Sequence, residues 1–209
     1  SGSRSFHSAL TALTEATNSW AVNIDNGLLN GVVFLDLKKA FDTIDHSMIL
    51  RKLKFYGTEQ QTLKWFQSYL YDRKQICSVN GHMSNLRPIS CGLPQGSNLG
   101  PLLLYFNDLP HCLSAASPRM FADDTNVSFA STSLSELENV LNWELQNVNI
   151  WLKANKFSLN IAKTEFMGIV SRQRLNVNAD GNINITINNQ LIKKVSETET
   201  LGMVIDQHL

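Results

Sequence analysis

The most regular apolar pattern in the chain lies at residues 133–156, "SLSELENVLNWELQNVNIWLKANK". Apolar residues recur there at the spacing of one helix face, and Ser133 with Glu136 fits the capping box that often begins a helix. A stripe of this kind is normally buried against other elements. We therefore predict a long helix whose core face is formed by Leu134, Leu137, Leu141, Leu145, Val148 and Trp151 or Leu152.

The other local patterns alternate between helices and strands. The run "GVVFLDL" (31–37) is rich in β-branched residues, which indicates a buried strand with Asp36 near its end. The "NG" at residues 80–81 lies between two strand-like arms and predicts a hairpin. We expect further helices at 5–24, 47–57, 59–74 and within 96–110, and strands around "FADDT" and at 164–170, 182–195 and 199–206. Helices and antiparallel hairpins interleave without a regular βαβ repeat, so the predicted fold class is α+β.

Composition limits the functions that remain open. The 209 residues are 43% hydrophobic and 17% charged, which is typical of globular protein and leaves room for one domain or two small ones. Lys plus Arg and Asp plus Glu each total 18, so any basic surface for nucleic acid must be local. Three widely spaced cysteines and short apolar runs predict a soluble intracellular protein without a zinc site or a membrane span.

Three carboxylates stand out as candidates for chemistry. Asp36 lies near the end of one predicted strand. Asp123 and Asp124 lie in "FADDT", almost ninety positions later. By themselves, Asp36 could cap the segment that follows it, and "DDT" could simply make a turn. If the two strands are sheet neighbours, however, the three acids converge, which is favourable chiefly when a divalent cation lies among them. Oxygen-only ligands favour Mg²⁺ or Mn²⁺, and two such ions can activate a hydroxyl and stabilise a leaving group.

Five motifs then occur in a fixed order: "FLDLKKAFDTIDH", "GLPQGSNLGPLL", "FADDT", "NKFSLNIAKTEFM" and "LGMVID". The chain thereby resembles the catalytic domain of reverse transcriptases, most closely those of non-long-terminal-repeat (LINE-type) retrotransposons. The likeness runs from about Arg4 to the last residue. It implies a right-hand polymerase palm, an antiparallel sheet with helices packed on one face, with incomplete fingers and no thumb. It also implies a division into an entry helix (1–30), the palm (31–195) and the start of the primer-grip region (196–209).

The resemblance assigns a role to each matching residue. Asp36, Asp123 and Asp124 would be catalytic and would hold two Mg²⁺ or Mn²⁺ ions, with the Leu37 carbonyl beside them. Phe41 would exclude a 2′-hydroxyl and so favour DNA synthesis, although it could instead be a core aromatic. Three further residues match family motifs. Gln95 and Gly96 would lie beneath the nascent base pair, and Lys163 could protonate departing pyrophosphate. Asp42, Asp45 and His46 are interpreted as turn, cap or support groups.

The same resemblance implies partners and a location. An RNA template, a DNA primer and deoxynucleoside triphosphates would bind, and no membrane would be needed. The remaining parts of a longer polyprotein, such as fingers, a thumb or an endonuclease, are expected outside this chain, and a LINE-type element favours the nucleus over the cytoplasm.

One departure from the pattern keeps a second function open. "GPLLLYFNDLP" is two residues shorter than usual in this family, and two residues rotate a helix by about 200°. The leading hypothesis is therefore an RNA-directed DNA polymerase domain. The alternative is a catalytically inactive remnant that only binds nucleic acid or protein. A third possibility, an RNA-templated RNA polymerase, is disfavoured by Phe41.

Overall fold

The computed structural model describes residues 8–93, 105–121, 124–171 and 183–208. The chain divides into two compact units. The first, which we call the sheet unit, comprises residues 1–38, 108–154 and 158–209. The second, the inserted unit, comprises residues 39–107 and 155–157. Helices, hairpins and a mixed sheet together confirm the predicted α+β class.

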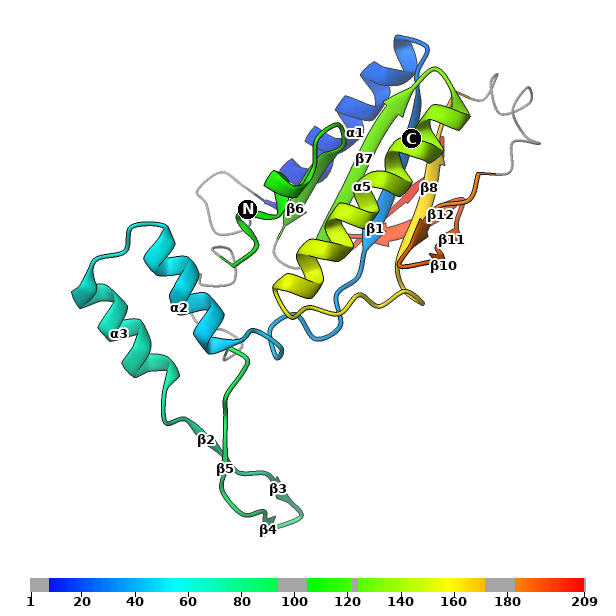
Figure 1. Ribbon diagram of the computed structural model, residues 1–209. Helices are drawn as coiled ribbons and strands as arrows, with labels where there is room; N and C mark the ends of the chain where they lie inside the picture. Colours follow the sequence, from blue (N-terminus) through cyan, green and yellow to red (C-terminus); the bar gives the residue numbers. More distant parts are fainter. Residues whose placement is uncertain (1–7, 94–104, 122–123, 172–182, 209) are drawn as a thin grey trace. The chain divides into compact units, whose positions relative to one another are not determined.

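The sheet unit is built on five strands in the order β11-β8-β1-β7-β6 (Figure 1). The central strand β1 pairs antiparallel with β7 on one side and with β8 on the other. At the two edges, β6 pairs antiparallel with β7, whereas β11 pairs parallel with β8. The strands are β1 Leu29–Leu35, β6 Ser117–Phe121, β7 Asp124–Ser131, β8 Glu165–Ile169 and β11 Lys193–Lys194.

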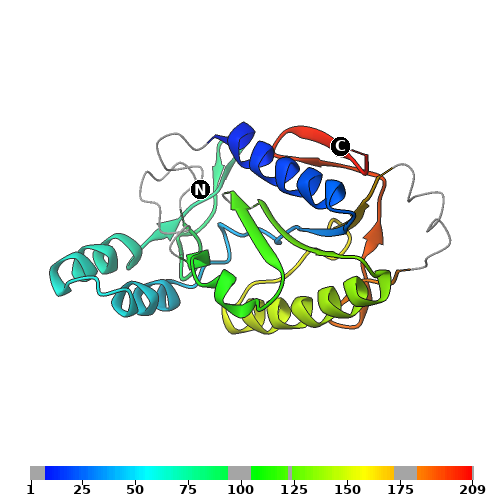
Figure 2. The same ribbon diagram turned by 90° about the horizontal axis from the view of Figure 1, so that it is seen from above.

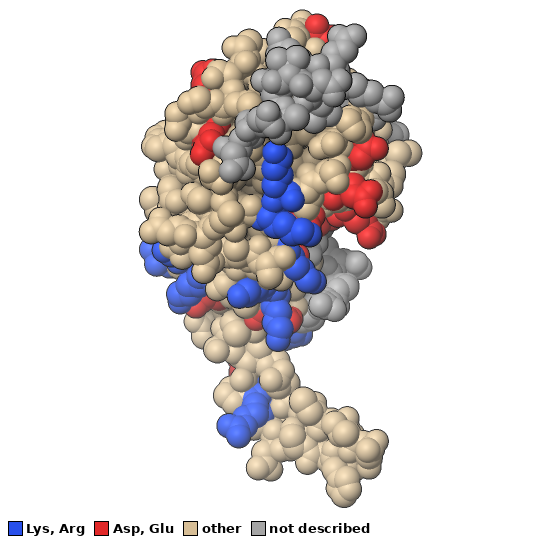
Figure 3. All heavy atoms as spheres, turned by 90° about the vertical axis from the view of Figure 1, so that its right-hand side faces the viewer, with Lys and Arg blue, Asp and Glu red and all other residues tan. Residues whose placement is uncertain are grey.

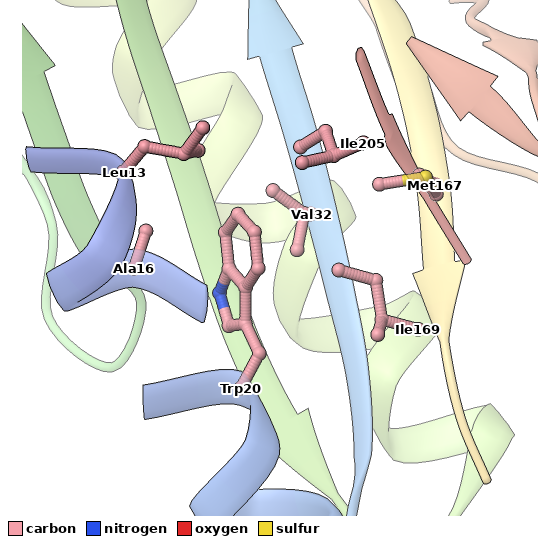
Figure 4. Close-up of a cluster of buried hydrophobic side chains, with 7 residues drawn as sticks. All are labelled: Leu13, Ala16, Trp20, Val32, Met167, Ile169 and Ile205. Atoms are coloured by element: carbon pink, nitrogen blue, oxygen red, sulfur yellow. The ribbon is translucent and has the colours of Figure 1, made fainter. Parts of the chain in front are cut away.

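Both faces of this sheet are covered (Figure 2). Helix α5 (Leu134–Ala154) packs on one face, and helix α1 (Ala9–Asp25) packs on the other together with the hairpin of β12 (Glu197–Thr200) and β13 (Met203–Asp206). The core on the α1 face contains the side chains shown in Figure 4: Leu13, Ala16, Trp20, Val32, Met167, Ile169 and Ile205.

The expected antiparallel sheet with helices on one face was therefore wrong on two points. The sheet is mixed, because β11 runs parallel to β8, and it carries a helix on each face. The reason lies in β1, where alternating side chains point to opposite faces and six of the seven residues are buried. A strand buried on both sides needs apolar cover on both sides.

The long helix α5 confirms the strongest local prediction, because Leu137, Leu141, Leu145 and Val148 are buried along one face. Its capping box is only half formed. The Ser133 hydroxyl accepts a hydrogen bond from the Glu136 backbone N–H at 3.4 Å. The Glu136 carboxylate instead accepts from the hydroxyl of Ser131, whose oxygen also accepts from the Ser133 N–H. The last residue of β7 therefore takes part in starting the helix.

The predicted strand at 182–195 is divided into three short strands. Strands β9 (Thr186–Ile187) and β10 (Gln190–Leu191) form a hairpin, and β11 then joins the main sheet. Asn188 and Asn189 make the turn with φ values of 51° and 61°. Asparagine tolerates this left-handed region better than most residues, so the pair sets the turn.

The inserted unit contains two helices, α2 (His46–Phe55) and α3 (Gln60–Leu70), followed by a two-stranded arm. The base of the arm pairs β2 (Lys74–Gln75) with β5 (Arg87–Pro88), and its tip pairs β3 (Ser78–Val79) with β4 (His82–Met83). Asn80 and Gly81 turn at the tip with positive φ, as the "NG" motif predicts.

The segment expected to form a helix up to Pro110 lies partly outside the described residues. Tyr105 and Phe106 follow the shortened part and are buried, and Phe106 stacks on Phe157 with ring centroids 4.7 Å apart. Pro110 itself lies within a 3₁₀ turn, η1 (Leu109–Cys112). In the described segments, no helix has both the length and the apolar character that crossing a membrane requires.

A glycine pair in the sheet gives a matched test of how closely α5 packs. A Cβ at Gly31 would lie 2.6 Å and 2.7 Å from methyl groups of Leu137 and Leu141, whereas a Cβ at its strand partner Gly168 would meet nothing within 4 Å. We expect Gly31→Ala to lower the free energy of unfolding by about 1–3 kcal/mol through overpacking. Gly168→Ala should change it little. Urea unfolding measures both, and equal effects would contradict the close packing.

Candidate active site

Two of the three predicted metal ligands follow or begin neighbouring strands. Strands β1 and β7 are paired up to Leu35 and Thr125. Asp36 is the next residue after Leu35, and Asp124 is the residue before Thr125 and the first of β7. The paired ladder ends at Leu35 and Thr125, so Asp36 and Asp124 lie next to the last paired residues at the same end of the two strands. The condition under which the acids would converge, that the two strands are sheet neighbours, is therefore met.

Both backbone polar groups of Asp36 form hydrogen bonds. Its N–H donates to the Thr164 hydroxyl at 3.3 Å, and its carbonyl accepts from the Asn160 N–H at 2.8 Å. The next residue, Leu37, forms an isolated antiparallel bridge with Leu159. The segment before β8 therefore fixes the exit of β1, so that Asp36 does not lie in a free loop.

Asp36 and Asp124 both line one cavity of about 520 Å³ in the sheet unit. The cavity lies on the face that carries the β12–β13 hairpin, since Phe34, Thr198 and Val204 also form its wall. Its charged lining in the described residues consists of Asp36, Asp124, Lys163, Glu165, Glu197 and Glu199. Five acidic residues and one lysine therefore line this space in the described residues, a balance that favours cations.

Glu165 ties the hairpin to the edge of the sheet. One carboxylate oxygen lies 3.2 Å from the Lys193 ammonium on β11, and the other accepts from the Thr198 hydroxyl on β12 at 2.7 Å. Figure 3 shows one group of Asp and Glu side chains on one side of the molecule, while other acidic side chains lie elsewhere in the view, some of them next to Lys and Arg.

The donor set fits hard divalent cations. Carboxylate and backbone oxygens without thiolate or imidazole are the ligands that Mg²⁺ and Mn²⁺ prefer. Within residues 8–93, 105–121, 124–171 and 183–208, no three His, Cys, Asp or Glu side chains gather closely enough to hold a metal. The third predicted ligand, Asp123, lies outside these ranges. The described residues therefore supply two of the three predicted ligands, and the metal site stays a prediction.

The other predicted residues lie in different parts of the chain. Lys163 is exposed in the wall of the cavity, immediately before Thr164 and β8. Phe41 belongs to the inserted unit, is half-buried, and accepts a backbone hydrogen bond from Leu93 at 2.9 Å. Gln95 and Gly96 lie outside the described residues.

Sequence reasoning missed several residues around the cavity. Glu165 and the acids of β12 line it, and Thr164 binds the Asp36 backbone beside it. The only sequence signal was that Thr164 and Glu165 follow Lys163 in "NIAKTEF". The β12 residues carried no such signal, because their place depends on how a distant hairpin packs on the sheet.

Glu144 was also missed, because it interrupts the apolar stripe of α5. Its side chain is fully buried, and Oε1 accepts backbone hydrogen bonds from Ser114, Ala115 and Ala116. These three residues lead directly into β6, whose last residue, Phe121, pairs with Asp124, so Glu144 anchors the strand beside this acid. Burial and the Glu144 charge raise the pKa of the Cys112 thiol to about 11, which keeps that thiol protonated.

The support roles expected for Asp45 and His46 are confirmed within the inserted unit. Asp45 is the N-cap of α2, and its carboxylate accepts from the Met48 N–H at 3.0 Å. The His46 Nε2 lies 2.7 Å from the Gly92 carbonyl oxygen. Hydrogen bonds from Lys156 and Ser47 hold the pKa of Asp45 well below its usual range.

Comparison with known proteins agrees with the motif order. The family model described as reverse transcriptase (RNA-dependent DNA polymerase) matches residues 2–205. The chain belongs to the reverse transcriptase family. This confirms the resemblance inferred from the five motifs, including the likeness to enzymes of non-long-terminal-repeat retrotransposons.

Individual relatives of this reverse transcriptase domain come from fruit flies. A probable RNA-directed DNA polymerase from transposon BS of Drosophila melanogaster is 28% identical over 224 aligned positions, covering 100% of this chain and 23% of the relative. The RNA-directed DNA polymerase from mobile element jockey of the same species is 29% identical over 84% of this chain and 19% of the relative. The chain thus spans about a fifth of the length of these relatives.

The lowered pKa of Asp45 makes part of the stability depend on pH. Because the folded pKa lies below the ordinary value near 3.9, the ionised carboxylate stabilises the fold above about pH 4, and this contribution is lost as the pH falls toward the lowered pKa. Asp45→Asn keeps a good N-cap residue but removes the ion pair with Lys156. We expect it to cost up to about 1 kcal/mol at pH 7 and progressively less below pH 4. Urea unfolding across this pH range measures the difference, and a constant difference would contradict the assignment.

Proposed function

We propose that this chain is the catalytic core of an RNA-directed DNA polymerase that extends a primer 3′-hydroxyl by two-metal nucleotidyl transfer. The observation that carries the proposal is the cavity wall shared by Asp36 and Asp124 at adjacent strand ends, in a chain that matches the reverse transcriptase family over residues 2–205. A neutral chain that concentrates five described carboxylates around one cavity is better suited to bind cations than to bind a bare phosphate.

Asp36, Asp123 and Asp124 would hold the ions, with the Leu37 carbonyl beside them. Bound Mg²⁺ or Mn²⁺ would help to deprotonate the primer hydroxyl and would stabilise the charge on the leaving pyrophosphate. The hydroxyl oxygen, after losing its proton to solvent, would form the new bond to the α-phosphorus of the triphosphate, while the bond from that phosphorus to the pyrophosphate oxygen breaks. Lys163, on the rim of the cavity, would donate a proton to the departing pyrophosphate.

The remaining predicted residues would select and position the nucleotide. The Phe41 ring would occupy the space that a ribose 2′-hydroxyl needs, which rejects ribonucleotides by shape alone. Gln95 and Gly96 would lie beneath the nascent base pair, where glycine allows close backbone approach and the amide can bond to a sugar or base edge. The RNA template, DNA primer and triphosphates follow as substrates.

The two acids in the described structure give the direct test of catalysis. We expect Asp36→Asn and Asp124→Asn each to reduce primer extension on an RNA template at least about a hundredfold, since even outer partners of metal ligands contribute 10–100-fold. Asp25→Asn, at the exposed end of α1, should leave extension unchanged. Extension that persists in either active-site variant would rule out the mechanism. A parent protein that binds nucleic acid in a salt-dependent way but extends no primer would favour the inactive alternative.

The sugar gate is tested by incorporation of ribonucleotides. We expect Phe41→Ala to reduce the preference for deoxynucleotides by about tenfold or more, the scale on which pocket shape discriminates substrates. Phe55→Ala is the matched control, because the Phe55 ring is 87% exposed in the same unit. Competition between labelled dCTP and CTP during primer extension measures the ratio. An unchanged ratio would assign Phe41 to packing instead.

A further inference from the structure

Three side chains of the inserted unit form a column outside the proposed catalytic cavity. Trp65 and Tyr69 are four residues apart on α3, and their rings stack with centroids 5.9 Å apart and planes inclined by only 8°. The Arg73 guanidinium, four residues further on, lies 4.6 Å from the centroid of the Tyr69 ring. Four-residue spacing keeps Trp65 and Tyr69 on one face of α3, whereas Arg73 follows the end of the helix at Leu70. Trp65 also contacts the Phe66 ring edge to face, with centroids 5.1 Å apart, and remains 49% exposed, so part of its surface is accessible to solvent.

Arg73 connects this column to a second cavity. The cavity has a volume of about 550 Å³ and lies within the inserted unit, with Arg73, Gln75, Ser90 and Gly92 in its wall. The contact with the Tyr69 ring restricts the position of the guanidinium, whose N–H groups can donate to an anion. In the described part of the chain, no carboxylate lies within ion-pair distance of Arg73, even though Asp42 lines the same cavity. The group is therefore restricted in position but not neutralised.

The distribution of charge indicates what this surface attracts. The inserted unit carries nine Lys and Arg residues and four Asp and Glu residues, whereas the sheet unit carries nine and fourteen. The formally neutral chain therefore consists of one unit with a net charge of +5 and one of −5. Exposed Lys64 and Lys74 flank the column in the sequence. A polyanion is thus favoured at the inserted unit and disfavoured at the sheet unit.

We propose that the inserted unit binds a single-stranded nucleic acid, with the Arg73 guanidinium on a phosphate and the exposed part of the Trp65 indole against a base. Aromatic faces combined with fixed guanidinium groups are the features that hold unpaired strands, since a duplex does not offer its base faces for stacking. The inference deepens the proposed function, because the strand held here would be the unpaired template. It does not require catalysis, so the two can fail separately.

Binding to a labelled oligouridine RNA of ~12 nucleotides, measured by fluorescence anisotropy without nucleotides or divalent ions, tests this site. We expect Trp65→Ala to weaken binding by about 5- to 100-fold, with little change in its salt dependence, because a stacked base carries no charge. Arg73→Ala should weaken binding and reduce the slope of log K against log salt by about 0.7, the value for one phosphate of a single strand. Trp65→Phe, which keeps an aromatic face, should restore most of the affinity.

The chain offers matched controls for both changes. Trp143 on α5 is 56% exposed in the sheet unit, and Arg51 on α2 is exposed in the inserted unit. We expect Trp143→Ala and Arg51→Ala to bind the RNA within about twofold of the parent and with the parent salt slope. Circular dichroism and the thermal midpoint identify any variant that is misfolded, and Arg73→Lys, which keeps the charge but not the planar group, replaces Arg73→Ala if that variant unfolds.

Three results are decisive. Loss of RNA affinity in the Trp65 and Arg73 variants, but not in the controls, supports the site, and Asp36→Asn should bind RNA like the parent even if extension is abolished. Equal binding by Trp65→Ala and Trp143→Ala, with an unchanged salt slope in the Arg73 variants, would overturn the proposal. Unchanged RNA binding together with altered self-association of Trp65→Ala in size-exclusion chromatography would assign the column to a protein contact, and would also overturn it.

Discussion

The candidate site depends on the register between β1 and β7. Side chains alternate between the two faces of a sheet, so a slip of one residue would turn Asp36 away from the face on which Asp124 lies. Two neighbouring residues of β1 prevent such a slip, and they do so from opposite sides. Asn30 donates to the Trp20 carbonyl of α1 and accepts from Asn23, whereas Gly31 leaves the space that Leu137 and Leu141 of α5 occupy. Exchanging their places would bury an unpaired amide beneath α5 and would remove the hydrogen bonds to α1.

This double attachment explains why helices are needed on both faces. A sheet covered on one side only would fix the register through a single set of apolar contacts, and similar apolar residues can replace one another in such contacts. A buried amide and a glycine cannot be exchanged in this way, because one requires polar partners and the other requires the absence of a Cβ atom. The position of the proposed catalytic acids therefore depends on packing about 20 Å away along β1, since the strand rises about 3.3 Å per residue from Asn30 to Asp36.

Local sequence patterns predicted the elements whose signals are contained within the segment itself. The stripe of α5, the "NG" turn of the arm and the buried strand β1 were all identified from spacing and turn chemistry. Sequence patterns did not identify the position of α1 on the opposite face, the parallel pairing of β11 or the acids of β12. Each of these features depends on contacts between distant segments. The shared cavity wall of Asp36 and Asp124 could be anticipated only on the condition that the two strands are neighbours. The role of Glu144 could not be predicted either. In the sequence, an acid within an apolar stripe resembles an ordinary polar position, and only the structure shows its three backbone donors.

The separation of charge between the two units has a consequence for the proposed reaction. Five carboxylates and one lysine in the described cavity wall create a potential that repels a triphosphate or a primer end. The cavity can therefore accept its proposed substrates only together with cations, and substrate affinity there should follow cation concentration. The inserted unit, with its excess of Lys and Arg, does not have this requirement and can hold a strand in the absence of divalent ions. In a chain organised in this way, binding of nucleic acid to the inserted unit would depend on the monovalent salt concentration. Binding of substrate in the catalytic cavity would depend on the divalent ion.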